Sequence, residues 1–191
     1  SRRQRQMCIR DSLNIAIGER TMKQIVTDRN IAIGYESQTS SVDASNNVSM
    51  GYKTLHQNIS GHQNVAIGYE SQINNKNDSN TSVGFKTLHS NVDGSNNIAV
   101  GHNTLYSNTS GYNLVGLGNN SLYSNKDGDR NMGLGNHSLH DVESGNDNIS
   151  LGYYSQYKTK AEKNISLGNY SLVNNTQGNN NTAIGYYSMN D

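Results

Sequence analysis

The most constraining feature of this 191-residue chain is a glycine that returns every 16 or 17 residues along nearly its whole length. Each glycine ends a short segment of the type Ala-Ile-Gly, and one such segment occurs almost unchanged twice, as NIAIGYESQ and NVAIGYESQ. The eleven glycines are Gly18, Gly34, Gly51, Gly68, Gly84, Gly101, Gly118, Gly135, Gly152, Gly168 and Gly185. A fixed period predicts an array of stacked units. We therefore expect residues 13–191 to form a single repeat domain.

The residues before each glycine alternate between large and small side chains. The positions three and one before the glycine carry Ile, Val, Leu, Met or Thr, and the position between them is always Ala, Ser or Gly. A two-residue period is that of a β-strand, in which alternate side chains share a face. We expect the large side chains to point into the core of their own unit and the small ones to point away from it.

A unit of 16 or 17 residues holds two or three short strands and is too small to bury its own apolar side chains. Stacking solves this problem, since in a parallel β-solenoid equivalent residues lie above one another about 4.8 Å apart, which gives an array of roughly 50 Å. Asn stands four before the glycine in ten units, with Leu114 as the exception, and we expect these amides to form a ladder. A helical repeat is excluded, because Asn, Gly and Ser or Thr recur at fixed points of every unit.

The glycine itself is expected to take a positive φ at the corner that ends the strand. Two kinds of unit are distinguished by the residue four after this glycine. Where it is Leu, a second glycine stands ten after the first, and where it is Gln or Met there is none. We expect the Leu to point inward and the second glycine to adopt a left-handed conformation. These second glycines are Gly61, Gly94, Gly111, Gly128, Gly145 and Gly178.

The position two after the glycine carries charges of alternating sign in the first five units, from Arg20 and Glu36 to Lys53 and onward. In a stacked array, successive members of this column are neighbours and attract each other. Each exposed contact contributes about 0.2 to 1 kcal/mol, so its main effect is on register.

Composition excludes several functions. Only 32% of residues are hydrophobic and the formal net charge is zero, so neither a nucleic-acid-binding surface nor a membrane-spanning segment is indicated. The first twelve residues, SRRQRQMCIRDS, share nothing with the repeat, and their codons can match a transposase adapter of sequencing libraries. We expect residues 1–12 to be a disordered sequencing-adapter artefact, and the rest to be a fragment of a longer fibre protein.

Units such as NNIAVGHNTLYSNTSGYN and NNTAIGYYSM resemble the NTAIGYxAL-type repeats of phage tail-fibre and related surface-fibre proteins, and more distantly the YadA-like head of trimeric autotransporter adhesins. The resemblance implies a left-handed β-roll, a homotrimer and attachment to a host or surface. The small column independently favours assembly, since a face of small residues suits close packing against another chain.

No catalytic, cofactor-binding or metal-binding residues are expected. His56, His89 and His140 share one column, but His56 and His89 are two units or about 10 Å apart, too far to share one metal. The best binding candidates are aromatic. Tyr35, Tyr52, Tyr69 and Phe85 follow the glycine directly. Tyr154, Tyr170 and Tyr187 form a second column, which we predict to contact a receptor or a sugar.

The sequence therefore favours a non-enzymatic structural and attachment segment of a phage tail fibre or a similar extracellular fibre, located in the virion or at a cell surface. Its expected partners are two further copies of the chain and a host-surface glycan or protein receptor, without nucleic acid or membrane insertion. The alternatives are a bacterial trimeric autotransporter adhesin head and an ice-binding solenoid. An enzyme is disfavoured because acids and bases do not cluster.

Overall fold

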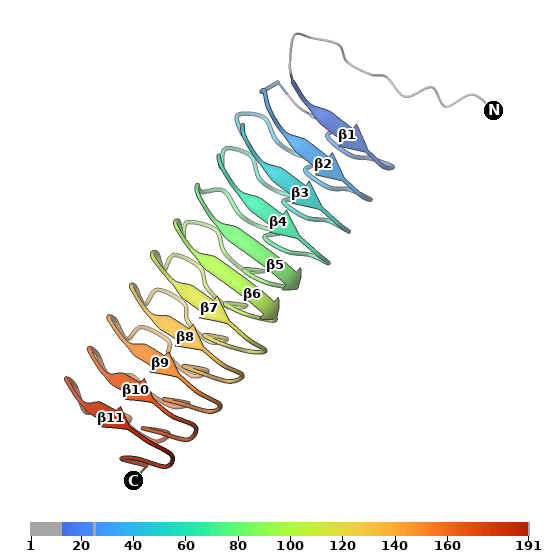
Figure 1. The fold of residues 1–191 in the computed structure, drawn as a ribbon. Coiled ribbons are helices and arrows are strands. Elements are labelled where there is room, and N and C mark those ends of the chain that lie inside the picture. Colours follow the sequence, from blue (N-terminus) through green and yellow to red (C-terminus); the bar gives the residue numbers. More distant parts are fainter. Residues whose placement is uncertain (1–12, 25, 191) are drawn as a thin grey trace.

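The computed structural model describes residues 13–24 and 26–190, and our expectation for residues 1–12 lies outside them. Eleven short strands form one parallel sheet in which each strand pairs with the next along the chain. They are β1 (Ile15–Ile17), β2 (Ile31–Ile33), β3 (Val48–Met50), β4 (Val65–Ile67), β5 (Thr81–Phe85), β6 (Ile98–His102), β7 (Val115–Leu117), β8 (Met132–Leu134), β9 (Ile149–Leu151), β10 (Ile165–Leu167) and β11 (Thr182–Ile184). Figure 1 shows the resulting β-solenoid, with β1 and β11 at opposite ends. We number the coils by their strands.

The register is like upon like, as the sequence predicts. Ile33 pairs with Met50, and Met50 pairs with Ile67, so the three residues share one environment on successive coils. The strand-ending glycines also pair in register where the strands are longest, at Gly84 and Gly101. The prediction of an all-β array of stacked parallel coils is therefore confirmed.

The expected direction of the strand side chains is wrong. The small residues of coils 2 to 11 are buried, with Ala32, Ser49 and Ala66 fully inaccessible, whereas Met50 is 43% exposed and Ile17 is 57% exposed. The interior of such a short coil is narrow: a Cβ added at Gly116 would lie 2.6 Å from Cγ2 of Thr104. Only small side chains fit there, so the large apolar residues point out of the coil.

The core is thin and largely polar. Its apolar part is a column of leucines at the position four after the glycine, and this inward direction was predicted. The Asn, Ser and Thr columns are also buried. The buried leucines of this column are Leu55, Leu88, Leu105, Leu122, Leu139 and Leu172. The low hydrophobic content of the chain is thus explained by its core, in which buried hydrogen bonds accompany the apolar contacts.

Each coil contains one strand and not the two or three expected from the sequence. The reason is a left-handed backbone at non-glycine residues: φ is 52° at Lys53, 48° at Leu55 and 58° at Gln63, and equivalent residues repeat this on other coils. Such a residue cannot belong to an extended strand. The Lys53 N–H still donates to Tyr35 O on the preceding coil at 2.9 Å, and the Leu55 N–H donates to Ser71 O on the following coil at 3.2 Å.

The first glycine of each unit behaves as predicted, with φ from 119° at Gly185 to 143° at Gly168. The second glycine does not, and the hypothesis of a left-handed conformation there is wrong, because none of the six is among the positive-φ glycines. Glycine is required at this position because there is no space for a side chain: a Cβ at Gly111 would lie 2.5 Å from Gly128 O and 2.6 Å from Oδ1 of Asn108.

Candidate binding surfaces

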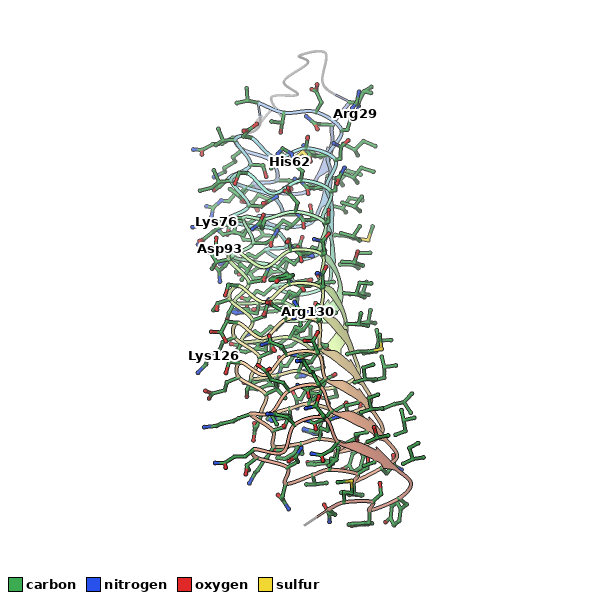
Figure 2. All side chains as sticks on the ribbon, turned by 90° about the vertical axis from the view of Figure 1, so that its left-hand side faces the viewer. Arg29, His62, Lys76, Asp93, Lys126 and Arg130 are labelled. Carbon is green, nitrogen blue, oxygen red and sulfur yellow. The ribbon has the colours of Figure 1, made fainter. Side chains whose placement is uncertain are left out.

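The outward side chains of the eleven strands form a continuous apolar face. This apolar face consists of the two columns three and one before the glycine, which hold only Ile, Val, Leu, Met and Thr. Its members reach 49% exposure at Leu151 within the array and 69% at Ile184 in the last coil. Figure 2 shows side chains standing out in a row from the strands, while the labelled Lys76 and Lys126 lie at the opposite side. At about 4.8 Å per strand the face is roughly 50 Å long.

The position five before the glycine, which holds Arg130 and Asp147, forms a polar column beside this face. Its best-defined contact is the ion pair in which Nε of Arg130 lies 2.6 Å from Oδ1 of Asp147, with Nη2 donating to the second carboxylate oxygen at 3.1 Å. The Arg130 hydrogen bonds lower the pKa of Asp147. An apolar centre with a polar border is the arrangement of a protein interface.

The alternating charges form three of the four contacts that the sequence predicts, all except the one between Lys53 and Glu70. Nη1 of Arg20 lies 3.0 Å from Oε1 of Glu36, and Nζ of Lys53 lies 3.7 Å from the other oxygen of the same carboxylate. The Arg20 hydrogen bond is the main cause of the lowered pKa of Glu36. Lys86 continues the pattern with Glu70 at 3.4 Å. Glu36 and Lys53 are therefore neighbours on successive coils.

Two aromatic columns run along the solenoid. The first joins Tyr35, Tyr52, Tyr69, Phe85 and His102, with centroids 4.9 to 5.5 Å apart and planes within 10° of parallel. The second runs over coils 5 to 9, with centroids 4.9 to 5.3 Å apart, and joins His89, Tyr106, Tyr123, His140 and Tyr157. In each column the rings cover one another's faces and leave their edges accessible.

The three predicted contact tyrosines lie together at the C-terminal end. Tyr154 and Tyr170 have centroids 5.8 Å apart, and Tyr170 and Tyr187 are 4.8 Å apart with planes 10° from parallel. Desolvation, and then the neighbouring Tyr153 and Tyr187, raise the pKa of Tyr170. Ring stacking alone accounts for this column, and its binding role stays a prediction.

Two further tyrosines, which sequence reasoning missed, lie beside this column. Tyr153 is 41% exposed and Tyr186 is 70% exposed. Both follow the strand-ending glycine directly, in the column that holds Tyr35 and Tyr52 farther up the solenoid. Asn169 separates them in this column, and that interruption is the sequence signal that sets them apart.

The histidines are distributed along the surface. Nδ1 of His140 lies 2.6 Å from Oδ1 of Asp141, and Nε2 of His89 lies 3.6 Å from Oε2 of Glu70. Burial, and then His140, lower the pKa of His137. Within residues 13–24 and 26–190, no three His, Cys, Asp or Glu side chains come together in a way that could hold a metal ion.

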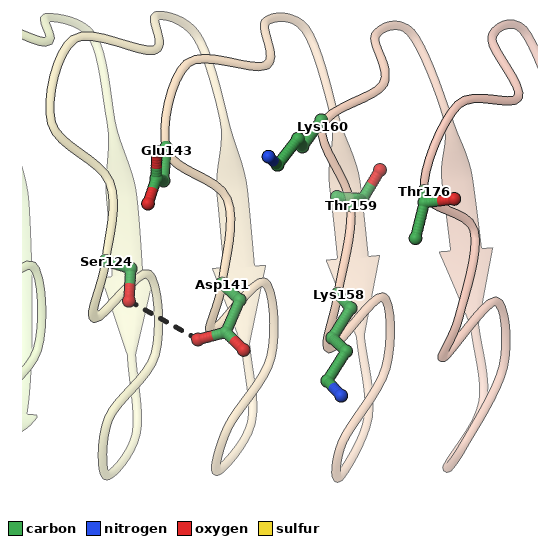
Figure 3. A pocket seen from close by; sticks show the side chains of 7 residues that line it. All are labelled: Ser124, Asp141, Glu143, Lys158, Thr159, Lys160 and Thr176. Carbon is green, nitrogen blue, oxygen red and sulfur yellow. Dashed lines mark hydrogen bonds between the residues drawn. The ribbon is translucent and has the colours of Figure 1, made fainter.

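A shallow depression lies on the loop side of the C-terminal coils, where coil 9 has only 16 residues. Figure 3 shows its side chains standing apart, joined by one weak hydrogen bond of 3.4 Å from Ser124 Oγ to Asp141 Oδ1. Its lining is Ser124, Asp141, Glu143, Lys158, Thr159, Lys160 and Thr176. The 3.4 Å between Ser124 Oγ and Asp141 Oδ1 is longer than the roughly 2.6 to 3.2 Å at which a nucleophile and its activating base are hydrogen-bonded.

Comparison with known proteins gives no match to a family model, to a curated protein or to a solved structure. Among the described residues, none belongs to a helix with the length and apolar character needed to cross a bilayer.

Proposed function

We propose that this chain is a non-enzymatic structural and attachment segment of a phage tail fibre or a similar extracellular fibre, and that it assembles as a homotrimer of left-handed β-rolls. The observation that carries the proposal is the apolar face. Soluble monomers rarely expose contiguous apolar patches of more than a few hundred Å². Two uncharged columns along eleven strands form a contiguous apolar surface, and its exposure to water is unfavourable.

Further copies of the chain suit this face best, because they carry the same rise per coil and the same length. Closed symmetry is the usual form of such assemblies, and the resemblance to surface-fibre repeats supports three copies. The sequence-based argument placed the small residues at the interface between chains. The large apolar columns take that role in this proposal, with the small residues inside each coil.

An attachment fibre also accounts better than an ice-binding solenoid for the hydroxyl columns. An ice-binding face needs a regular array of exposed Thr. The invariant Ser or Thr column is instead buried, with Ser37, Thr54 and Ser71 fully inaccessible. The adhesin head remains the alternative within the same fold, and the sequence that flanks the array in the gene would distinguish it: a membrane-anchor barrel favours the adhesin, and a self-cleaving chaperone domain favours the phage fibre.

The oligomeric state tests the proposal. Sedimentation equilibrium of the full chain should give three times the mass of one chain. The double variant Leu117→Asp and Leu151→Asp places charges on two residues that are 39% and 49% exposed in the single chain, and should give monomers. Ser110→Asp, which adds a charge on the exposed loop side, should remain trimeric. A wild-type chain that stays monomeric at every concentration would rule the proposal out.

A further inference from the structure

The column that directly follows the glycine has two arrangements along the solenoid. In coils 2 to 6 every member is aromatic, and the rings stack on one another with planes within 10° of parallel, as between Tyr52 and Tyr69. Each ring in the middle of this stack has a neighbour on both faces. A flat ligand has access only to edges there.

In coils 9 to 11 the same column is Tyr153, Asn169 and Tyr186. Asn136 and Asn169 stand on the coils on either side of Tyr153, and Asn169 stands on the coil before Tyr186, so within the described residues neither ring has an aromatic neighbour in its own column. Both rings are turned instead. The plane of Tyr153 lies 83° from that of Tyr170, and the plane of Tyr186 lies 87° from it.

This turn presents ring faces to solvent. Tyr170 and Tyr187 stack along the solenoid axis, so a ring perpendicular to them has a plane that runs parallel to the axis. Tyr186 lies beside Tyr187 on the same coil, with centroids 4.5 Å apart at 85°, and so places one face against the edge of that ring. Tyr153 lies in the same way beside Tyr154, at 4.6 Å and 66°. The opposite face accounts for the 41% exposure of Tyr153, whereas Tyr186, at 70%, also lies in the last described coil, which no other described coil follows.

The spacing of the two rings fits a repeating ligand. Two coils separate Tyr153 from Tyr186, which corresponds to about 10 Å along the axis. An extended β-1,4-linked glycan has a disaccharide repeat of similar length, and alternate sugars in it present the same face. The axial C–H groups of a pyranose form an apolar face that packs on an aromatic ring, while the tyrosine hydroxyl provides a polar contact. Two rings at this interval, each nearly perpendicular to the ring of Tyr170, therefore support alternate sugars of one chain.

Asn169 can contact the sugar between them. Its Oδ1 accepts the backbone N–H of Tyr153 at 2.8 Å, which fixes the orientation of the amide. The side chain is exposed, so Nδ2 is left to donate to a hydroxyl group of the glycan. The site has no formal charge among these three residues, which suits a neutral sugar.

We propose that Tyr153, Asn169 and Tyr186 bind an extended β-1,4-linked glycan of neutral pyranose sugars that lies along the fibre axis. This inference rests on the proposed function, in that it names the ligand class of an attachment segment. It also changes the predicted contact residues. The rings of Tyr154, Tyr170 and Tyr187 cover one another, so the proposed contact is with the two neighbouring rings, Tyr153 and Tyr186.

Isothermal titration of the full chain tests the site with cellohexaose, hexa-N-acetylchitohexaose and xylohexaose, and with α-linked maltohexaose as the linkage control. We expect at least one β-1,4-linked hexasaccharide to bind and maltohexaose not to. The double variant Tyr153→Ala and Tyr186→Ala should lower the association constant by about tenfold or more, since both ring contacts are lost. The double variant Tyr52→Ala and Tyr69→Ala removes two rings from the stacked column and should bind as the wild type does.

A second variant keeps all tyrosines. Asn169→Tyr puts a ring between Tyr153 and Tyr186, so the three should stack as Tyr52 and Tyr69 do, and binding should fall by about tenfold. The inference is overturned if no β-1,4-linked hexasaccharide binds, if maltohexaose binds equally well, or if Asn169→Tyr binds like the wild type. Sedimentation of the same samples separates the two proposals, because a trimer that binds no glycan contradicts only the site, and a monomer contradicts the assembly.

Discussion

The side-chain oxygen of Asn47 accepts the backbone N–H of Asn64 on the next coil at 2.8 Å, and the amide Nδ2 of Asn47 donates to Gly61 O at 2.9 Å. Asn47 thus joins the backbone of its own coil to that of the next, and Asn80 and Asn131 repeat both contacts. The sequence predicts a ladder of amide side chains in this column. Such contacts occur there at some steps, as where Nδ2 of Asn47 also donates to Oδ1 of Asn30 at 3.2 Å, and they are shorter in a second column, where Nδ2 of Asn108 donates to Oδ1 of Asn91 at 2.7 Å.

Replacement of Asn64 by Ala should therefore destabilise the solenoid. The change leaves the Asn80 N–H, which Oδ1 of Asn64 accepts at 2.9 Å, without this partner, whereas the Asn77 carbonyl keeps the amide Nδ2 of Asn75 at 2.7 Å. One unsatisfied group next to the core corresponds to about 1 to 3 kcal/mol of unfolding free energy. Urea denaturation measures the change, and Asn119→Ala at an exposed position is the matched control. Equal stability of the two variants would contradict this account of the column.

The strand-ending glycine gives a second prediction. At Gly101, φ is 138° and an added Cβ would lie 2.5 Å from Gly118 O, whereas at Gly185 φ is 119° and nothing lies within 4 Å. Gly185→Ala introduces backbone strain alone, about 1 to 2 kcal/mol. Gly101→Ala adds a clash with the next coil and should lose about 3 to 5 kcal/mol. The difference between the two urea midpoints measures the close approach of the coils, and no difference would show that φ alone requires glycine.

The column of buried leucines gives a third prediction, because Gln156 interrupts it between Leu139 and Leu172. All three side chains are buried, and Oε1 of Gln156 has no hydrogen-bond partner among the described residues. Nε2 donates to Ile149 O at 2.9 Å and to Asn164 O at 3.4 Å, and the latter also accepts the Ile149 N–H at 2.8 Å.

Gln156→Leu would remove the unsatisfied oxygen and extend the apolar column. We expect a gain of about 1 kcal/mol in unfolding free energy, seen as a higher melting temperature. Gln156→Glu, of nearly the same shape, should lower it because a carboxylate would be buried there. A leucine variant less stable than the wild type would show that the Nε2 hydrogen bonds outweigh the buried oxygen.

The sequence predicts the coils and their register well and the direction of the side chains poorly. The fixed glycine period places Ile33, Met50 and Ile67 in one column, because like residues stack only when the coils are in phase. Alternation shows which side chains share a face and does not show which face is inside. The width of the coil decides this, and that width depends on contacts such as Gly116 with Thr104, which lie far apart in the sequence.

The left-handed residues could not be read from the sequence for a related reason. Leu55 and Tyr154 have φ of 48° and 52°, although neither residue type favours that conformation. Hydrogen bonds between coils maintain it, such as Tyr154 N–H to Asn136 O at 3.0 Å. The orientation of Tyr153 likewise depends on its contacts with neighbouring rings, so the column of Tyr154 could be predicted while the accessible ring beside it could not.

The final prediction concerns His137, which lies among rings of its own coil and the next. Its centroid is 4.5 Å from that of Tyr154 and 5.3 Å from that of His140, and its Nδ1 is buried without a hydrogen-bond partner among the described residues. The pKa of His137 is lowered below its ordinary value of 6.5, mainly by burial and secondly by the charge of His140. A histidine with a lowered pKa binds fewer protons in the folded state than in the unfolded state just below that value.

The stability that neutral His137 allows is therefore fully present above about pH 7 and decreases as the pH falls below about 6.5, until the folded-state pKa is passed. His137→Tyr extends the column of Tyr154, Tyr170 and Tyr187 with a ring that does not ionise in this range, so the unfolding free energy should fall less between about pH 7 and pH 5. Asn120→Tyr adds a ring to the same column but keeps the imidazole, and should retain the wild-type pH dependence. Urea midpoints across this range measure the effect, and parallel curves for the wild type and His137→Tyr would show that His137 does not control the response of the solenoid to acid.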